Sequence, residues 1–257
     1  MAASTAALRG ITKQYKDFTL GPVDMTVPAG SIVGLIGENG AGKTTLLKIL
    51  CGVNRADDGT VDLLGGSPAD AATRAKIGVV FEDAFFYGSF TAAQVARSLA
   101  GMYGARWNAD SFSAYLRRFG LDAGKKLKEY SRGMRLKLSL AAALAHDPEL
   151  LVLDEATAGL DPVVRGELLD LFLEFIQDER HSIVMSSHIT ADLEQIADSI
   201  AYLHNGQLLF QENKDDLLQE YGVLHCGEDV LTSLPAGLVV FTRRGAYGCE
   251  SLVRERR

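Results

Sequence analysis

Hydrophobic residues along the chain gather in short runs separated by turns and by longer amphipathic segments. Such compact apolar runs, bounded by turn residues, are typical of buried strands in a parallel sheet. The predicted strands are Ser31–Ile36, 77–81, Leu150–Leu153 and Ile183–Ser186. Between them, apolar residues at helical spacing predict a helix from Gly42 to Gly52 and another from about Pro162 to Glu179.

Three other segments have patterns of their own. Residues 6–33 read as short β-runs broken at Gly21-Pro22 and at Pro28-Ala29-Gly30. Residues 91–147 are rich in alanine, leucine, lysine and arginine, which indicates a mostly helical lobe. After about residue 222 the pattern weakens, and short apolar runs indicate a small appendage or a partly mobile tail. The order of elements predicts an α/β domain with a mostly parallel sheet and one inserted helical lobe.

Composition narrows the class of protein. The 257 residues are 47% hydrophobic and carry a net charge of −7, with no block of lysine or arginine that would suggest a nucleic-acid partner. Three widely separated cysteines are expected to be reduced thiols and not a disulfide framework or metal site. The first ten residues do not resemble a secretory signal, and no stretch approaches the ~20 apolar residues that span a bilayer.

A glycine-rich loop directly follows the strand Ser31–Ile36. It reads Gly-Glu-Asn-Gly-Ala-Gly-Lys-Thr and matches the phosphate-loop pattern between a strand and a helix. Its glycines let backbone N–H groups point at phosphate oxygens, the lysine supplies a cation, and the threonine hydroxyl is a Mg²⁺ ligand. The predicted nucleotide-binding residues of this segment are Gly37, Glu38, Asn39, Gly40, Ala41, Gly42, Lys43, Thr44 and Thr45.

A second acidic motif follows the strand Leu150–Leu153. Asp154 is expected to bind Mg²⁺, because an anionic oxygen suits a hard cation. Glu155 is expected to orient and deprotonate the water that attacks the γ-phosphate. A nucleotide-switch GTPase and a small-molecule kinase share this pair of motifs. The sequence has no Asn-Lys-x-Asp segment for reading guanine, which argues against the GTPase.

Further motifs lie in a fixed order around these two. Tyr130–Met134 precedes a helix, and its Ser131 lies 23 residues before Asp154. Ala158-Gly159-Leu160-Asp161 follows the acidic pair, and Ser186-Ser187-His188 follows the next apolar strand. Together with Tyr15 near the start, these segments resemble the signature, communication loop, switch histidine and adenine-stacking aromatic of ABC transporter ATPases.

This resemblance covers about residues 6–220 and carries expectations for the whole fold. It implies a P-loop NTPase core of the RecA type, an N-terminal antiparallel β-subdomain and an inserted α-helical subdomain at about 86–147. On that basis we expect an ABC ATPase domain at 1–222 and a small C-terminal extension of unknown role at 223–257.

The resemblance also implies roles for individual residues. It implies that Tyr15 stacks on adenine and that His188 senses the γ-phosphate and belongs with Lys43 and Glu155 to the catalytic group. Ser131 and Gly133 would hold the γ-phosphate bound to an opposite subunit. Asp161 would help the two ATP sites communicate, although an aspartate before a proline is also an ordinary helix start.

Two positions depart from the family pattern. The usual signature is Leu-Ser-Gly-Gly-Gln, whereas here Arg132 replaces the first glycine and Met134 the glutamine. Glu82 stands where the family usually has a glutamine that links Mg²⁺ to the membrane partner. A carboxylate is still an oxygen ligand, so Glu82 joins Thr44 and Asp154 as an expected metal ligand.

The expected function is that of an ATP-binding and ATP-hydrolysing transporter subunit that uses ATP and Mg²⁺. The chain resembles bacterial efflux ATPases of the bacitracin, lantibiotic and peptide-exporter types. The resemblance implies a head-to-tail homodimer, or a heterodimer with a similar ATPase, working on separate transmembrane permease subunits at the inner face of the membrane. Phe85-Phe86-Tyr87 would either receive a coupling helix or pack the helical lobe. The alternative is a soluble ABC ATPase associated with ribosomes or DNA.

Overall fold

The fold was obtained as a computed structural model, which describes residues 4–81, 86–235, 237–245 and 248–254. Residue contacts divide the chain into two compact units, Met1–Gln211 and Glu212–Arg257. Each unit has its own sheet, and the two are described separately below.

The first unit is built on a six-stranded sheet with the order β5-β6-β7-β3-β8-β9. Its strands are β5 Ile77–Val80, β6 Leu150–Asp154, β7 Ser182–Ser187, β3 Ile32–Ile36, β8 Ser199–His204 and β9 Gln207–Asn213. The pairs from β5 through β8 are parallel, which puts the carboxyl ends of β3, β6 and β7 at one edge. All residues of β6 and β7 are buried, so the continuous apolar runs correctly predict central strands.

A three-stranded antiparallel sheet forms a second layer of this unit. It has the order β2-β1-β4, with β1 Ser4–Gln14, β2 Thr19–Pro28 and β4 Asp58–Leu63. The expected break at Gly21-Pro22 is wrong, because β2 continues through it. At Gly21, whose φ is +98°, a Cβ atom would collide with the carbonyl oxygen of Ile11, beside a register shift in β1. Here the glycine allows close approach of two strands instead of ending one.

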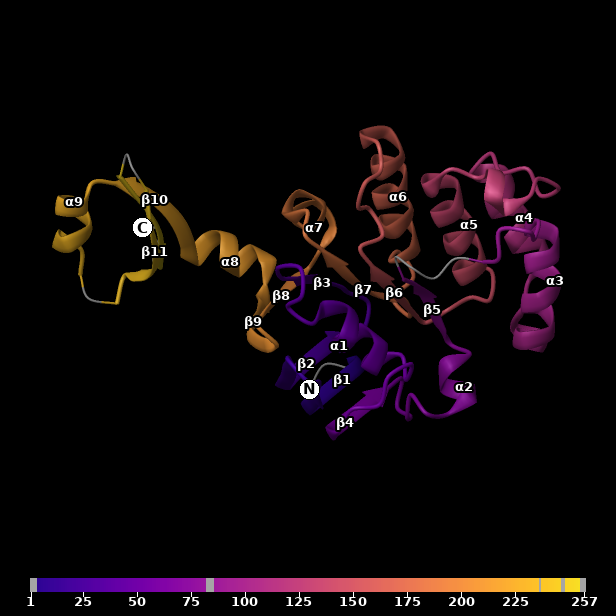
Figure 1. The fold of residues 1–257 in the computed structure, drawn as a ribbon, viewed down its shortest axis with the longest axis horizontal. Helices are drawn as coiled ribbons and strands as arrows, with labels where there is room; N and C mark the ends of the chain where they lie inside the picture. Colours follow the sequence, from indigo (N-terminus) through magenta and orange to yellow (C-terminus); the bar gives the residue numbers. More distant parts are fainter. Residues whose placement is uncertain (1–3, 82–85, 236, 246–247, 255–257) are drawn as a thin grey trace. The chain divides into compact units, whose positions relative to one another are not determined.

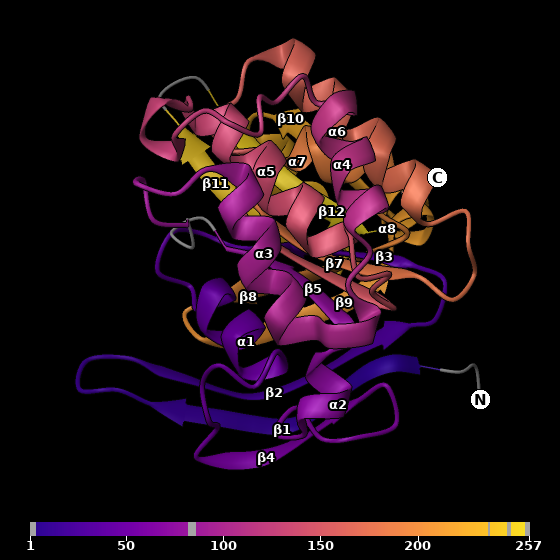
Figure 2. The same cartoon turned by 90° about the vertical axis from the view of Figure 1, so that its right-hand side faces the viewer.

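Helix α1, Lys43–Leu50, joins the two sheets into one core. Its apolar residues belong to the same buried cluster as side chains from both sheets. They are Leu46, Leu47, Ile49 and Leu50. Figure 2 shows β1, β2 and β4 as one layer, with α1 between them and the strands of the six-stranded sheet. The helix that begins at the phosphate loop is therefore held on both sides.

The helical lobe lies between β5 and β6 in the sequence. It contains α3 Ala92–Tyr103, a 3₁₀ turn Gly104–Arg106, α4 Ala109–Arg118, a second 3₁₀ turn Leu127–Glu129 and α5 Arg132–Leu144. These helices, grouped together in Figure 1, enclose a separate apolar cluster around Phe112. Three helix starts have a side-chain cap, at Thr91, Asn108 and Ser131. The fold class is thus confirmed: an α/β core with an antiparallel β-layer and an inserted helical lobe.

Three further helices complete the first unit. They are α2 Ala71–Arg74, α6 Pro162–Phe175 and α7 Thr190–Ile196. The sequence pattern placed the end of α6 at about Glu179, but the helix ends earlier, at Phe175. The reason is a local turn in which the Asp178 side chain accepts from the backbone N–H of Arg180 at 3.0 Å, which competes with helical hydrogen bonding. Within the described parts of the chain, no helix is long and apolar enough to cross a bilayer.

The second unit has an antiparallel sheet with the order β10-β12-β11. Its elements are α8 Lys214–Glu220, β10 Tyr221–Cys226, α9 Glu228–Ser233, β11 Val239–Gly245 and β12 Gly248–Arg254. The apolar run Val230–Leu234 largely falls in α9, and the run that ends at residue 241 enters β11. The division between units falls after Gln211, before the expected domain end at residue 222. The sequence assigns no role to this extension.

Candidate functional site

The phosphate loop connects β3 to α1, and two glycines in it have left-handed backbones. Gly40 has φ +83° and Gly42 has φ +107°. A Cβ atom on Gly42 would lie 2.9 Å from the Phe18 ring, and one on Gly37 would collide with the carbonyl oxygen of Leu203. The loop therefore needs glycine for its conformation at position 42 and for close packing at positions 37 and 42.

Lys43 opens helix α1 and is almost fully buried, with 6% of its surface exposed. Its Nζ donates to the carbonyl oxygen of Gly37 at 2.7 Å and to that of Glu38 at 3.3 Å. The same nitrogen lies 3.4 Å from Oε1 of Glu155. A buried cation is thus positioned between the loop and the second acidic residue of the strand β6.

The carboxylate of Asp154 ends strand β6 and is held by two hydroxyl groups. Thr44 Oγ1 donates to its Oδ2 at 2.7 Å, and Ser186 Oγ donates to its Oδ1 at 2.6 Å. Parallel pairing of β6 with β7 puts Asp154 directly beside Ser186. Sequence reasoning placed Ser186 in a motif but gave it no role. The sequence showed Ser186 only at the end of an apolar strand, and the pairing of that strand with β6 comes from the fold.

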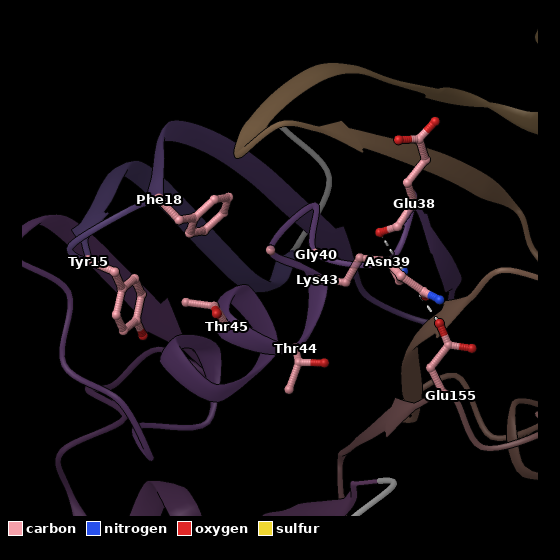
Figure 3. A pocket seen from close by; sticks show the side chains of 10 residues that line it. Tyr15, Phe18, Glu38, Asn39, Gly40, Lys43, Thr44, Thr45 and Glu155 are labelled. Atoms are coloured by element: carbon pink, nitrogen blue, oxygen red, sulfur yellow. Dashed lines mark hydrogen bonds and ion pairs between the residues drawn. The ribbon is translucent and has the colours of Figure 1, made fainter.

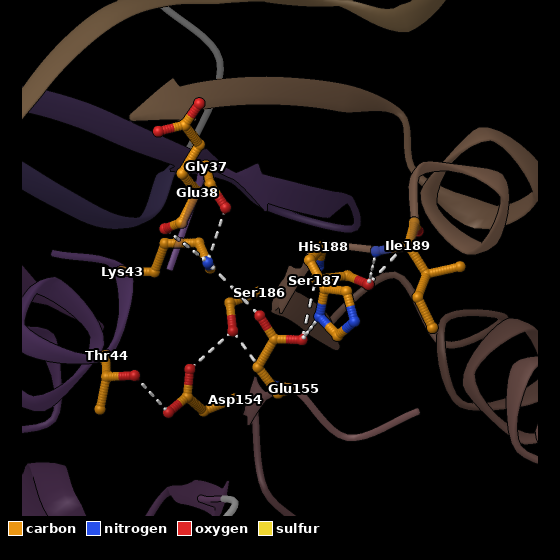
Figure 4. A network of polar contacts seen from close by, with 10 residues as sticks. All are labelled: Gly37, Glu38, Lys43, Thr44, Asp154, Glu155, Ser186, Ser187, His188 and Ile189. Carbon is orange, nitrogen blue, oxygen red and sulfur yellow. Dashed lines mark hydrogen bonds and ion pairs between the residues drawn. The ribbon is translucent and has the colours of Figure 1, made fainter. Parts of the chain in front are cut away.

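Glu155 follows Asp154 and links the loop to His188. Its Oε2 lies 2.6 Å from Nδ1 of His188, and its backbone N–H donates to Ser186 Oγ at 3.0 Å. The residue has φ +51°, an uncommon conformation for a non-glycine residue. Its buried Oε1 has no hydrogen-bond partner among the described residues. Figure 4 shows the resulting chain of polar contacts from Lys43 through Glu155 to His188.

A cavity of about 390 Å³ lies over the phosphate loop. The residues that line it are Tyr15, Phe18, Glu38, Asn39, Gly40, Gly42, Lys43, Thr44, Thr45 and Glu155. As Figure 3 shows, the aromatic rings lie at one end and Glu155 at the other. Gly37 takes part through its carbonyl oxygen, whereas Ala41 is 4% exposed and belongs to the core.

Phe18 is a cavity residue that the sequence reasoning missed. Tyr15 N–H donates to the carbonyl oxygen of Phe18 at 2.8 Å, and their ring centroids are 6.4 Å apart. This turn brings a second aromatic ring to the same wall as Tyr15. A second aromatic three residues after the first, in a turn between strands, was the signal in the sequence. The wall offers flat apolar faces of the kind that stack on a nucleobase.

The donor set around Thr44 and Asp154 fits a magnesium ion. Hydroxyl and carboxylate oxygens are hard ligands, and Mg²⁺ in nucleotide sites takes one or two protein ligands together with phosphate oxygens. Within the described ranges, no group of three or more His, Cys, Asp or Glu side chains is arranged to hold a metal. A sparse oxygen pair of this kind suits an ion shared with a nucleotide. The third expected ligand, Glu82, lies outside the described residues.

The signature residues lie elsewhere. Ser131 caps helix α5, accepting from the Met134 N–H at 3.2 Å, and Asp161 caps helix α6, accepting from the Val163 and Val164 N–H groups. Of the described residues that line the cavity, none comes from the segment 130–134, and Asp161 is also not among them. The structure therefore brings the phosphate loop, the acidic pair and His188 together, but it leaves Ser131 and Asp161 outside the cavity over the loop.

Arg132 packs against its own chain. A Cβ atom on Gly159, which has φ +69°, would lie 3.0 Å from Nη1 of Arg132. Likewise, a Cβ atom on Gly133 would lie 3.6 Å from a methyl group of Leu160. The start of the signature helix therefore lies against the loop that follows the acidic pair.

The aromatic run at 85–87 is only partly described, since Phe85 lies outside the described residues. Phe86 packs against the apolar cluster of the helical lobe, while Tyr87 is exposed. The prediction that this run packs the helical lobe therefore applies to Phe86. For the exposed Tyr87, the other prediction, a surface that receives a coupling helix, still stands.

Comparison with known proteins places this architecture in a family. The profile described as "ABC transporter" matches residues 20–158. An ABC transporter ATP-binding protein of Synechocystis sp., described as uncharacterized, is 38% identical over 78% of the chain. A bacitracin transport ATP-binding protein of Enterococcus faecalis is 36% identical over 80% of it. A solved structure of an ATP-binding subunit of an ABC transporter superposes with a TM-score of 0.76 at 29% identity, covering 83% of this chain and 92% of that one.

The chain is shorter than some of these relatives. The match spans 58% of the length of the Synechocystis protein and 68% of the Enterococcus protein. The shared domain therefore shows the family, but it does not carry over to this chain what the relatives do as whole proteins.

Proposed function

The chain belongs to the ABC transporter family of ATP-binding proteins, and we propose that it binds and hydrolyses ATP to drive an exporter of peptides or drugs. One observation carries this proposal. Lys43, Thr44, Asp154, Glu155 and His188 form one polar network that is connected through Ser186, and Lys43, Thr44 and Glu155 line the cavity. A cation, an oxygen pair for a metal and a carboxylate–imidazole pair are the parts that phosphoryl transfer to water requires.

Each residue has a distinct task in this proposal. Lys43 binds the β- and γ-phosphates, and the loop N–H groups bind the remaining phosphate oxygens. Thr44 and Asp154 would hold Mg²⁺, which when bound would offset the negative charge that develops on the phosphates. Glu155 accepts the proton of the attacking water, and His188 orients the Glu155 carboxylate through its 2.6 Å contact. Tyr15 and Phe18 stack on the base.

The separation of the signature from the cavity supports a dimer. Ser131 and Gly133 lie at a helix start that does not line the cavity of their own chain. In a head-to-tail dimer, each signature would close the nucleotide site of the other subunit. Helix starts present backbone N–H groups and a positive dipole end, which favours binding of a γ-phosphate. A second copy, or a similar ATPase, would supply this half of each site.

The transport part of the proposal rests on the relatives. A bacitracin transport protein matches over most of the chain, which supports export of peptides or drugs. The membrane path would be formed by separate permease subunits, and the chain would bind peripherally at the cytoplasmic face through them. Tyr87, exposed beside the helical lobe, is a candidate contact for such a permease. Glu82 would link the bound metal to the same partner.

Mixing two inactive variants tests the composite site. Lys43→Ala damages the loop half of a site, and Ser131→Ala damages the signature half. In a mixed head-to-tail dimer, one site combines both damaged halves while the other combines both intact halves. We expect an equimolar mixture to recover roughly a quarter of wild-type ATPase activity, since about half of the dimers are mixed and have one intact site each.

The controls distinguish a composite site from a site within one chain. A double variant carrying both changes, mixed with either single variant, has no intact site and should stay inactive. Wild-type protein should show ATPase activity that rises with the square of concentration when dimers are scarce. An inactive mixture of well-folded single variants would count against the composite site, and activity linear in concentration would place all the machinery in one chain.

Transport needs its own experiment. The chain should co-purify with a hydrophobic permease, and peptides or drugs carried by that permease should stimulate the ATPase activity. Co-purification with ribosomes or DNA, and stimulation by either, would favour the soluble alternative instead.

A further inference from the structure

Two cysteines lie opposite each other in the sheet of the second unit. Cys226 ends strand β10, and Cys249 is its direct partner in the antiparallel strand β12. Directly opposed residues of an antiparallel pair point to the same face, and their Cα atoms are about 4.5–5.5 Å apart. A disulfide needs Cα atoms about 4.4–6.8 Å apart. The backbone therefore holds the two thiols at a separation that a disulfide can bridge.

The thiol of Cys249 has an arranged environment. It is 5% exposed, and its Sγ donates to Oε2 of Glu228 at 2.9 Å. Arg244 holds the same carboxylate, with Nη2 at 2.9 Å and Nε at 3.0 Å from Oε1. The hydrogen bond to Glu228 raises the pKa of the Cys249 thiol, and burial and the nearby Cys226 raise the pKa further. Cys249 is thus kept protonated and hydrogen-bonded to the Glu228 carboxyl, whose pKa is lowered by its hydrogen bonds from Arg244 and Cys249.

The other two thiols differ from Cys249 in accessibility. Cys226 is partly exposed, so a small oxidant reaches it first. Cys51 is 2% exposed in the core of the first unit. Burial, with the negative charge of Asp154, raises the pKa of Cys51 to about 12 and makes it unreactive. Among the three thiols, the chemistry is therefore confined to the pair in the second unit.

From this placement we infer that Cys226 and Cys249 form a redox-active dithiol, oxidised to an intramolecular disulfide by hydroperoxides. The site is independent of the ATP cavity and of the activity proposed for it. It is a modification site in which Glu228 acts as the proton acceptor and Arg244 fixes the carboxylate. Dithiol pairs of this kind in reducing compartments are transient and serve as sensors or catalysts.

The reaction proceeds in two balanced steps. The Cys226 thiolate attacks one oxygen of a hydroperoxide, breaks the O–O bond and becomes a sulfenic acid, while the other oxygen takes up the proton released by Cys226 and leaves as an alcohol or as water. Cys249 then attacks the sulfenic sulfur and forms the S–S bond, while its proton passes through Glu228 to the departing hydroxide, which leaves as water. The two sulfurs are oxidised by two electrons and the peroxide is reduced by two. A small-molecule dithiol reverses the change.

Metal binding is the competing use of such a pair. The Glu228 carboxylate is already engaged by Arg244 on two sides. In the described parts of the chain, no set of three or more His, Cys, Asp or Glu side chains is arranged around a metal position. Two thiols with one occupied carboxylate make a poor zinc site, which favours disulfide formation over metal binding.

Thiol counting with mass spectrometry tests the inference on the full chain. The reduced protein is treated with hydrogen peroxide at a few equivalents. One portion is taken for its intact mass, and another is denatured, blocked with a maleimide so that all free thiols are counted, and digested. We expect two of the three thiols to disappear together, the intact mass to fall by about 2 Da, and a peptide linking Cys226 to Cys249 to appear. Dithiothreitol should restore all three thiols.

Single substitutions separate the two steps. Cys249→Ser should leave a sulfenic acid at Cys226 that dimedone captures, and Cys226→Ser should give neither disulfide nor dimedone adduct. Cys51→Ser is the matched control and should oxidise like the parent chain. Oxidation of Cys226 to sulfinic acid without linkage, cross-linking only between chains, or thiols protected by co-purified zinc would each overturn the inference.

Discussion

The phosphate-loop half and the signature half of the proposed ATP site are built in opposite ways. Around the loop, Lys43 pairs with Glu155, and Asp154 accepts from Thr44 and Ser186, so the contacts join segments that are far apart in the sequence. In the signature half, the hydrogen bonds that Ser131 and Asp161 make within the described ranges go to the first turn of their own helices. One half is a long-range network, and the other is a pair of local helix starts.

This difference shows what each half contributes. A network of buried charges is costly unless each member has a partner, so the loop half is fixed when the domain folds. A helix start needs nothing from the rest of the site to be stable. Its cap and N–H groups lie at a surface and can be used by another molecule. We therefore expect substitutions in the loop half to change chemistry or binding within a chain, and substitutions in the signature half to act across two chains.

The largest effect should follow from Glu155→Gln. The amide keeps the shape of the side chain but cannot accept a proton, so turnover should fall by about 10²–10⁴-fold while ATP binding is retained. Phosphate release and equilibrium binding of a fluorescent ATP analogue measure the two properties separately. In this variant, ATP should also produce a stable dimer detectable by light scattering.

Glu149→Gln is the matched control for that change. Glu149 lies just before the other end of the same strand and pairs with Lys76 at 3.2 Å on the surface. It should leave turnover within about twofold of wild type, because exposed ion pairs contribute little. A Glu155→Gln variant that hydrolyses ATP as fast as this control would remove Glu155 from the role of base.

Lys43→Ala should have the next largest effect, on nucleotide binding. A charge-assisted hydrogen bond contributes about 1.5–3 kcal/mol, so ATP affinity should drop by about 10–150-fold. Lys76→Ala, which removes an exposed lysine paired with Glu149, is the control and should bind ATP normally. Isothermal titration calorimetry measures the ATP affinity, and thermal unfolding checks that each variant is folded. Unchanged affinity in a folded Lys43→Ala protein would contradict the assignment of the loop.

Much of this comparison was predictable from the sequence. The parallel strands and the phosphate loop follow from apolar runs and one motif, because both are local patterns with fixed geometry. Phe18 was missed because its signal, an aromatic residue three positions after Tyr15 in a turn, is weak: a stacking role needs only a flat ring and has no fixed motif. The contacts of Ser186 were also beyond sequence reasoning, because its link to Asp154 depends on which strand lies beside β6. Continuation of β2 through Gly21 was hidden because glycine signals both turns and close approach.

Ser131→Ala tests whether the signature half acts beyond its helix. Loss of the cap should lower the free energy of unfolding by about 1 kcal/mol. Asn108→Ala removes a cap of the same kind in the same lobe, where Asn108 accepts from the Ser111 N–H at 2.9 Å. Both variants should lose similar stability in urea, but only Ser131→Ala should also lose almost all of its ATPase activity, about 100-fold, because a hydrogen bond to a charged phosphate contributes up to about 3 kcal/mol. Equal activities would reduce Ser131 to a structural cap.

The smallest effect concerns the aromatic wall, and it separates binding from packing within the loop half itself. Tyr15 is 43% exposed, whereas Phe18 is partly buried against the core and lies beside Gly42. Tyr15→Ala should raise the ATP concentration for half-maximal activity by roughly five- to tenfold, since stacking on a base contributes about 1–3 kcal/mol, and should barely change stability. Phe18→Ala should do both, lowering the free energy of unfolding by about 1–3 kcal/mol through lost packing. Tyr15→Phe is the control for stacking and should behave like wild type. Steady-state kinetics with ATP and urea unfolding of the three variants check these outcomes. A Tyr15→Ala variant with unchanged ATP dependence would shift the stacking role to Phe18, and unchanged dependence in both variants would leave the base outside this wall.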